Sequence, residues 1–227
     1  MKKKFYTEWA YFLALAGLAL GTAGMEASNF GVSMIVAPAY LIHLEVSKHL
    51  PFFSFGMAEY MLQGVLLLLT CMFVRRFKLS YLFSFVTAVL YGLMLDISMA
   101  LIGLLPTHLM AVRVVCYAVG LLLSTAGVAM MFHTYIPGEA YEVFVMEASQ
   151  RLHVDIHLFK TGFDVCFCLI AIALSFLFFG FGHFEGIKWG TVLCTLLNGW
   201  LISRYTKLFE KHLQFTDGLP LRKYFSR

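Results

Sequence analysis

The chain has 227 residues, of which 60% are hydrophobic and 13% are charged, and its mean hydropathy is +0.80. Soluble domains carry about 25% charged and about 45–50% apolar residues, so this composition excludes a water-soluble enzyme fold and predicts a polytopic membrane protein. The formal net charge of +4 is modest and is predicted to lie mostly on one side of the membrane. It therefore indicates membrane topology, and we expect no nucleic-acid partner.

The cysteine and histidine residues supply no disulfide or metal pattern. All five cysteines lie inside apolar segments, and Cys166 and Cys168 would point to different sides of a helix. His153 and His157, with Asp155 between them, have helical ligand spacing but no third strong ligand nearby. No nucleotide-binding loop, nucleophile elbow or metallohydrolase signature occurs. We expect no metal, no cofactor and no enzymatic activity.

Six apolar segments are predicted to be transmembrane helices that cross the ~30 Å hydrocarbon core. They are Trp9–Gly24, Met57–Val74, Leu79–Leu104, Leu109–Phe132, Leu158–Phe181 and Ile187–Ser203. The first follows Met1 and three lysines, as a secretory signal would. Its glycine pattern recurs later in the chain, so we expect this helix to be retained as part of the fold.

Two further segments are predicted not to cross. Phe30–Leu44 has fifteen residues, which rise only about 22 Å as a helix, and Pro38 interrupts it, so a re-entrant or half-spanning segment is expected. Tyr135–His157 opens with Pro137-Gly138 and carries five charged residues. Each would cost about 2.5–3.5 kcal/mol at the bilayer centre. Two interpretations stay open for this stretch: a cytoplasmic loop, or a broken, partly inserted helix lining a polar cavity.

Charge placement favours six crossings. With six, fourteen Lys and Arg residues fall on the cytoplasmic side, Lys48 and Lys188 fall outside, and Arg113 lies in the membrane. With eight, Arg75, Arg76 and Lys78 move outside, Lys48 moves inside, and the distribution becomes twelve against four. The positive-inside rule prefers the first arrangement, and eight crossings remain an alternative.

The chain contains a weak internal repeat. The run Gly17–Gly24 (GLALGTAG) recurs at Gly120–Gly127 (GLLLSTAG), 103 positions later. Glu59 aligns with Asp164, and the segment 92–96 aligns with 199–203. A slowly drifting offset is typical of a duplicated unit.

Each unit is predicted to contain one helix, then a short broken segment, and then two further helices. With three crossings per unit, the second copy is inverted in the membrane, an architecture typical of transporters and channels. With four crossings per unit, the two copies would have the same orientation and the repeat would be parallel. The expected fold is thus all-α, with six transmembrane helices, two short segments and two inverted three-helix repeats. The expected domains are residues 1–107, residues 108–206 and a basic amphipathic cytoplasmic tail, 207–227.

Small motifs also resemble a known family. They are the glycine-spaced first helix, Asn29-Phe30-Gly31-Val32-Ser33, Ser54-Phe55-Gly56 and Gly92-x3-Asp96. Together they resemble the YczE/YyaS/YitT group of bacterial membrane proteins over most of the chain, although that group more often keeps an unbroken helix around Pro38. The resemblance implies a bacterial plasma-membrane protein and no settled biochemical activity.

Four ionisable residues fall inside predicted spans, with Asn198 as a neutral companion: Glu59, Asp96, Arg113 and Asp164. An intramembrane ionisable residue is a functional-site hypothesis by default, because its desolvation must be offset. The alternative is structural. Arg113 would then pair with Asp96 or Glu59, or extend its side chain to the membrane surface.

Glu139 and Glu142 form the second candidate site. They are three residues apart after a chain break, so they would share one face of a helix N-terminus, where carboxylates interact well with the helix dipole. One interpretation is a solvated acidic face. The other is an acidic, aromatic-edged site, with Tyr135 and Tyr141 nearby, that binds a cation, an amine or a proton. The matching region of the first repeat, from Asn29, is neutral and polar.

Two functions stay open. The first is a transporter or channel for a small, amine-bearing or cationic solute, with Glu59, Asp96, Asp164 and Glu139–Glu142 near the pathway and alternating access about the inverted repeat. The second is a non-transporting interaction or regulatory protein whose charged Glu139–Asp155 stretch and basic tail recruit a cytoplasmic partner. In both cases we expect contact with membrane lipid, both termini in the cytoplasm, and a homodimer as an open alternative.

Overall fold

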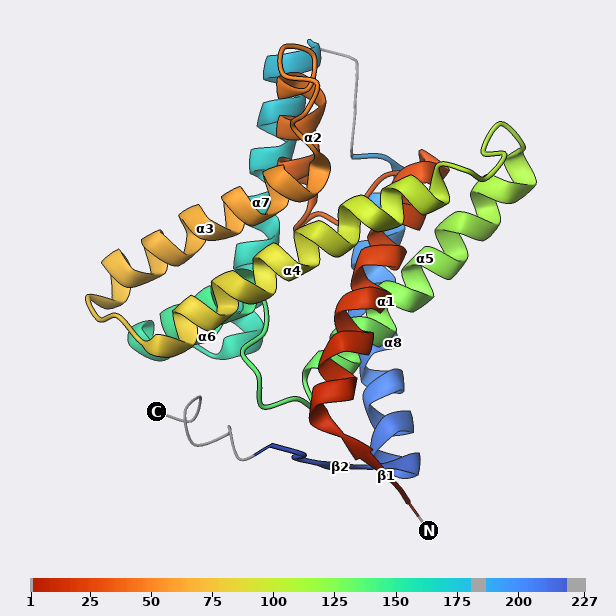
Figure 1. The fold of residues 1–227 in the computed structure, drawn as a ribbon. Coiled ribbons are helices and arrows are strands. Elements are labelled where there is room, and N and C mark those ends of the chain that lie inside the picture. The colour runs from red at the N-terminus through yellow and green to blue at the C-terminus, as the bar shows by residue number, and fades with distance from the viewer. Residues whose placement is uncertain (1, 181–186, 220–227) are drawn as a thin grey trace.

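The computed structural model describes residues 2–180 and 187–219, apart from the side chains of residues 79, 156 and 157. Within these ranges the chain folds into eight helices and two short strands (Figure 1). They are β1 (Lys3–Tyr6), α1 (Thr7–Ser28), α2 (Ala37–Val46), α3 (Phe55–Val74), α4 (Leu79–Ile102), α5 (Met110–Met131), α6 (Ala140–Leu152), α7 (Ile156–Phe179), α8 (Trp189–His212) and β2 (Leu213–Thr216).

Five helices are long and apolar enough to span a membrane: α1, α3, α4, α5 and α7. They correspond to the first five predicted spans and support an integral membrane protein. The sixth predicted span, Ile187–Ser203, lies mostly within α8, which is not among the five. Arg204 and the charged residues after it lower the hydropathy of α8, because the helix continues beyond the predicted span to His212.

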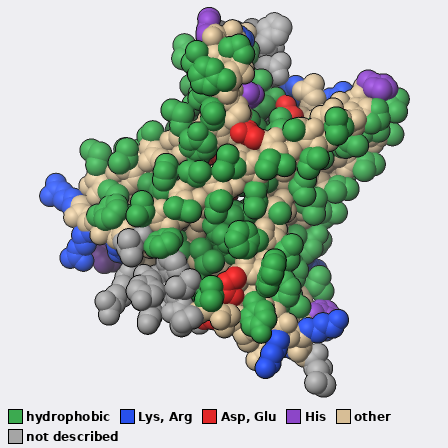
Figure 2. All heavy atoms as spheres, viewed as in Figure 1, with side chains coloured by type: hydrophobic (Ala, Val, Ile, Leu, Met, Phe, Trp, Pro, Cys, Tyr) green, Lys and Arg blue, Asp and Glu red, His purple; other side chains and the backbone are tan. Residues whose placement is uncertain are grey.

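The surface agrees with a membrane environment. Figure 2 shows hydrophobic side chains covering most of the visible face, with Lys and Arg side chains at its margins. Long apolar side chains such as Leu68, Met72 and Leu177 are more than 60% exposed. A soluble monomer rarely exposes such a continuous apolar surface, whereas lipid tails solvate it.

Both predicted short segments are helical. α6 begins directly after the Pro137-Gly138 break, as predicted, and Glu139 is its N-cap. α2 has only ten residues, but Pro38 lies in its first turn and does not interrupt a longer helix. Proline is favoured there because its missing N–H has no partner in the first turn anyway.

The two glycine runs pack against each other. α1 and α5 are antiparallel, since a Cβ on Gly17 would meet Gly127 and a Cβ on Gly24 would meet Gly120. At the centre of the contact, a Cβ on Gly21 would lie only 2.5 Å from the backbone nitrogen of Ser124. The prediction that these small residues allow close helix approach is confirmed. In lipid, such backbone proximity supplies the packing that the hydrophobic effect cannot.

Helix packing follows a similar scheme in both halves of the chain. α1 packs against α4, and α5 against α8. α2 packs against α3 of its own half and α7 of the other, while α6 packs against α7 of its own half and α3 of the other. α3 and α4 also pack extensively, with Gly56 and Gly92 at their crossing, and the described residues of α7 and α8 have no contact of similar extent.

The two ends of the described chain form a small sheet that the sequence did not predict. β1 and β2 pair in parallel, with Lys3 opposite Leu213 and Tyr6 opposite Thr216. Glu8 holds the following turn, because its carboxylate accepts hydrogen bonds from the backbone N–H groups of Gly218 and Leu219. The predicted amphipathic tail, 207–227, is therefore the end of α8 followed by a strand as far as residue 216, and residues 220–227 lie outside the described ranges.

We expect Gly21→Leu to destabilise the protein strongly, by about 1–3 kcal/mol or more, because the new side chain forces α1 away from α5. Thermal unfolding of the detergent-purified protein would measure the effect. Gly162→Leu on α7 is the matched control, since a Cβ there meets nothing within 4 Å. Equal melting temperatures for the two variants would contradict the proposed role of this contact.

Candidate functional site

The helix α6 is packed inside the protein. It contacts α3, α4 and α7, and one face is buried: Ala140, Tyr141, Val143, Val145 and Ala148. Of the two interpretations of the 135–157 stretch, a free loop does not match this packing, and a short helix that enters the protein interior does. The chemistry of the site begins at its first turn.

Glu59 of α3 lies directly beneath that turn. Its side chain is 1% exposed, and its Oε1 accepts hydrogen bonds from the Tyr141 hydroxyl at 2.9 Å and from Gln63 Nε2 at 3.3 Å. Its second oxygen, Oε2, is buried without a hydrogen-bond partner among the described residues. Glu59 and Tyr141, predicted separately as site residues, are therefore in direct contact.

Gln63 connects α3 to the beginning of α6. Its Oε1 accepts a hydrogen bond from the Ala140 backbone N–H at 3.0 Å. This bond satisfies one of the amide groups that a helix N-terminus leaves without an intrahelical partner. The fully buried Gln63 thus orients both Glu59 and the first turn of α6.

Glu139 is the N-cap residue of α6, directly before the first turn of the helix. Its Oε1 is buried without a hydrogen-bond partner among the described residues. Burial, and then the neighbouring charges of Glu59 and Glu142, raise the pKa of Glu139 well above its usual range, while Lys160 of α7 opposes that increase. Ionising Glu139 is thus costly beside two other carboxyl groups.

Glu142 completes the group, which we call the acidic cluster: Glu59, Glu139 and Glu142. Its side chain is half-buried and folds back over Gly138, where a Cβ would lie against its Oε2. Burial raises the pKa of Glu142 to about 7, and the charge of Lys160 opposes the shift. Three carboxyl groups therefore gather around one helix N-terminus.

Three tyrosines from different helices surround the acidic cluster. Tyr91 of α4 is within electrostatic range of Glu59 and Glu139, and it shares a hydrogen bond with Thr22 of α1. Tyr11 of α1 hydrogen-bonds to Thr87 of α4, whose hydroxyl also contacts the carbonyl oxygen of Pro137 at the loop before α6. With Tyr141, these side chains give the site a polar, aromatic wall.

Four of the residues around the acidic cluster were not identified from the sequence: Gln63, Lys160, Tyr11 and Tyr91. Gln63 was detectable, because it is an amide within an apolar segment four residues after Glu59. Lys160 carried a signal of the same kind. Tyr11 and Tyr91 carried none, since tyrosine is common in membrane helices and only the packing of α1, α4 and α6 brings them to one place.

Asp96 has a different position. It lies near the end of α4 and accepts hydrogen bonds from the Ser54 hydroxyl at 2.6 Å and from the Gly56 backbone N–H at 2.8 Å. Ser54 is the N-cap of α3 and also accepts from the Met57 N–H. Asp96 therefore stabilises the N-terminus of α3, where a negative charge is favourable. The Ser54-Phe55-Gly56 and Gly92-x3-Asp96 motifs form one packing unit.

Arg113 forms an ion pair with neither Asp96 nor Glu59 among the described residues. Its Nε donates to the carbonyl oxygen of Ser28 at 2.6 Å, and its guanidinium lies 5.0 Å from the centre of the Phe30 ring. It thus binds the last carbonyl of α1, a favourable position for a cation at a helix C-terminus. Arg113 therefore does not form the interior ion pair that was one prediction. It contacts the C-terminal end of α1, which agrees better with the alternative that its side chain extends towards the membrane surface.

The remaining candidates lie away from the acidic cluster or at its edge. Asn29 is exposed at the end of α1 and accepts a hydrogen bond from the Lys188 ammonium. Asn198 lies on α8, which packs mainly against α5. Asp164 forms an ion pair with Lys160 on its own helix at 3.6 Å. The charge of the same lysine acts on Glu139 and Glu142, so Asp164 lies at the edge of the acidic cluster.

The described residues contain no group of three or more metal-binding side chains. His153 ends α6 in a left-handed conformation, and the side chain of the second histidine of the predicted pair lies outside the described atoms.

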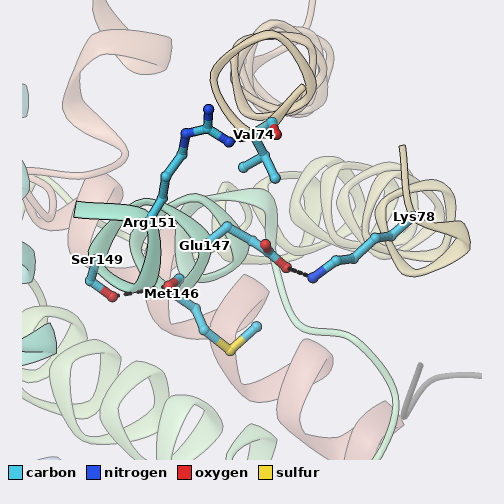
Figure 3. Close-up of polar contacts among 6 residues, drawn as sticks. All are labelled: Val74, Lys78, Met146, Glu147, Ser149 and Arg151. Carbon is cyan, nitrogen blue, oxygen red and sulfur yellow. Dashed lines mark hydrogen bonds and ion pairs between the residues drawn. The ribbon is translucent and has the colours of Figure 1, made fainter. Parts of the chain in front are cut away.

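The other end of α6 is attached to the α3–α4 turn (Figure 3). Glu147 forms an ion pair with Lys78 at 2.5 Å. Arg151 donates to the carbonyl oxygen of Val74 at 2.7 Å, and its guanidinium lies 5.8 Å from the centre of the Phe73 ring. The charges at this end of α6 therefore bind neighbouring helices within the protein.

One family model covers this architecture. It matches residues 5–207, from β1 into α8, and its description is a family of unknown function, DUF6198. The chain belongs to the DUF6198 family. No curated protein and no solved structure matches the chain. The match includes every candidate residue named above, and the resemblance to the YczE/YyaS/YitT group remains an expectation beside it.

The stability of the protein should depend on pH through Glu142. Its pKa rises from 4.5 to about 7 on folding, so between these values the folded protein binds more protons and stability falls as pH increases. Glu142→Gln cannot ionise at this position, so the difference between its melting temperature and that of the wild type should shift in favour of the variant as pH is raised from about 5 to about 8. The exposed Glu210 provides the control Glu210→Gln, which should follow the wild type. A constant gap across this range would contradict the assignment.

Proposed function

We propose that this protein is a membrane transporter or channel-like protein for a small cationic or amine-bearing solute. The observation that carries the proposal is the buried Glu59 carboxyl, held by Tyr141 at the N-terminus of a short interior helix. Discontinuous helices that meet near the midplane form the substrate and ion sites of many secondary transporters. A polar group so deep in an apolar fold is costly unless function requires it.

The chemistry of the acidic cluster supports a cationic solute. Three carboxyl groups converge, and Lys160 is the basic residue whose charge acts on Glu139 and Glu142. A cation placed among them would offset their mutual repulsion and their desolvation. The tyrosine wall adds hydroxyl groups and aromatic surface, both of which suit an organic ammonium group.

An inverted repeat is supported by packing. The order of long and short helices is the same in α1–α4 and α5–α8, and the first helices of the two halves pack antiparallel through their equivalent glycine runs. Antiparallel packing of equivalent helices is expected when a unit with an odd number of crossings is duplicated. Alternating access would then be a movement of one half against the other.

A pair of cation–π contacts supports the same symmetry. Arg151 at the end of α6 lies over Phe73 near the end of α3, and Lys48 just after α2 lies 4.7 Å from the ring centre of Phe179 at the end of α7. Because α2 corresponds to α6 and α7 to α3, each short helix is attached by its C-terminal cation to a long helix of the other half. We propose that the two contacts close opposite faces of the pathway.

The terminal strands support an even number of crossings, and charge placement favours six of them over eight. Pairing of β1 with β2 brings the start of α1 and the end of α8 to the same side of the molecule. An even number of crossings between them is consistent with the five apolar spans and α8 as the sixth, and it excludes five crossings alone. The positive-inside rule then places both termini in the cytoplasm, and the resemblance to the YczE/YyaS/YitT group points to a bacterial plasma membrane.

A docking function is the second candidate, and one observation favours it. A shallow groove of about 420 Å³ follows the second half of α8. It is lined by Trp200, Leu201, Arg204, Tyr205, Lys207, Leu208 and Lys211. A basic, aromatic surface of this kind fits an acidic partner or anionic lipid.

A ligand screen tests the first candidate. At 100-fold above its dissociation constant, a ligand of the folded state stabilises it by about 2.7 kcal/mol, which a thermal-shift assay detects. We expect a selective shift with amines or monovalent cations, but not with purines or vitamins, and its loss in Glu142→Gln. Glu210→Gln should retain the shift. The absence of a shift with every ligand would contradict the transport proposal and favour docking.

Thiol accessibility tests the gating contacts. In a background without native cysteines, Glu142→Cys should react with an impermeant reagent from the cytoplasmic side. Adding Arg151→Gln should accelerate this reaction about threefold, since a lost cation–π contact is worth about 0.5–1 kcal/mol. Adding Lys48→Gln should slow it, because that change favours opening of the opposite face.

The exposed Arg76 supplies the control. Arg76→Cys should react from the cytoplasmic side at one rate in every background. Reaction only from outside would rule out the inverted repeat, and equal rates for Glu142→Cys in all backgrounds would indicate a permanent docking surface.

A further inference from the structure

We propose that Glu59 is the proton-binding site of this protein and that Glu139 and Glu142 carry the proton between Glu59 and the aqueous face beside Lys160. This inference names the coupling ion of the proposed transporter and to that extent rests on the proposed function. Proton binding by Glu59 can be tested without any solute.

The hydrogen bonds of Glu59 are those of a neutral carboxyl group. Oε1 accepts from two donors, Tyr141 and Gln63, while the equally buried Oε2 accepts from none among the described residues. A carbonyl oxygen takes hydrogen bonds in this way, and the unpaired oxygen is the one that carries the hydrogen. An ionised carboxylate would instead leave half of its charge buried on an oxygen with no partner.

No described cation forms an ion pair with Glu59. The groups that face it come from the elements packed against α3. α4 contributes Tyr91, and α6 contributes Tyr141, Glu139 and, one turn further, Glu142. On α2, Tyr40 and His43 face Phe55, one turn before Glu59, and the His43 ring bonds to the carbonyl oxygen of Phe53. Tyrosines and carboxyl groups cannot neutralise the charge of a carboxylate. We therefore infer that a bound proton neutralises Glu59.

A route for the proton follows from the order of the acidic cluster. Glu139 immediately precedes Ala140, whose N–H donates to Gln63, the amide that also holds Glu59, and Glu142 lies in the first turn of α6. Lys160, whose charge acts on Glu139 and Glu142, is about half exposed. Glu142 releases its proton to water, the carboxylate left on Glu142 accepts the proton of Glu139, and the carboxylate left on Glu139 accepts the proton from the O–H of Glu59. Each step breaks one O–H bond and forms another, so charge moves outward along the chain of carboxyl groups.

Transfer of this proton changes what the site can bind. With Glu59 protonated, the interior is neutral and compatible with its apolar surroundings. Loss of the proton creates an unpaired buried charge, which a solute cation at the acidic cluster would offset. Proton release and cation binding would then be linked, as exchange transport requires.

Infrared spectroscopy of the protein in lipid vesicles tests proton binding directly. We expect the wild type to show the C=O stretching band of a protonated carboxyl group at neutral pH. Glu59→Gln should lose the Glu59 component of this band, while the components of other protonated carboxyl groups remain. Tyr141→Phe should shift the Glu59 component, because a hydrogen bond to the carbonyl oxygen disappears. Glu210→Gln is the control and should keep the band in place. An identical band in the wild type and Glu59→Gln would show that Glu59 is ionised and overturn the proposal.

The relay has its own readout. After transfer into D₂O, the Glu59 band shifts as its proton exchanges, and Glu139→Gln should slow this exchange several-fold while leaving the band itself intact. An unchanged exchange rate would remove Glu139 from the route. A Glu59 band together with a negative ligand screen would keep the proton site and reject transport of the solutes tested. A missing band with a positive screen would reject the proton site and keep transport.

Discussion

The contact between α1 and α5 is the interaction on which the rest of the structure depends. Three small residues on each helix allow the backbones to touch at Gly21, and no larger side chain fits there. α4 is attached to α1 and α8 to α5. The antiparallel α1–α5 pair forms the most extensive contact between the two halves, and the α2–α7 and α3–α6 contacts add to it. Because lipid provides no hydrophobic force between helices, direct backbone packing carries this stabilisation.

The acidic cluster exists because two elements from different halves meet. Glu59 belongs to α3, and Glu139 with Glu142 belongs to the beginning of α6. Gln63 and Tyr141 connect them through hydrogen bonds that satisfy the helix N-terminus and one oxygen of Glu59. The far end of α6 is held by Lys78 and by the carbonyl oxygen of Val74, so the short helix is fixed at both ends. A group of carboxyls in such a frame is poised to respond to protons or cations.

Much of the candidate site was visible in the sequence as single residues. Glu59, Glu139 and Glu142 were identified because charge in an apolar chain is conspicuous, and Tyr141 was identified as an aromatic residue beside two of them. Their neighbours Tyr11 and Tyr91 were not, since nothing local distinguishes them from other membrane tyrosines. Asp96 and Arg113 were conspicuous in the same way, yet they contact helix ends. Composition detects a buried charge but does not say whether its partner is a ligand or a backbone amide.

The sequence by itself determined the membrane character, the positions of the long helices, the two short segments and the repeat of the glycine runs. These properties depend on hydropathy, on chain breaks and on residue size, which are local. Only the tertiary structure decided that the glycine runs face each other, that the terminal residues pair as strands, and that α6 enters the interior above Glu59. Such contacts join residues from distant parts of the chain, and their energies depend on packing geometry that no local pattern encodes.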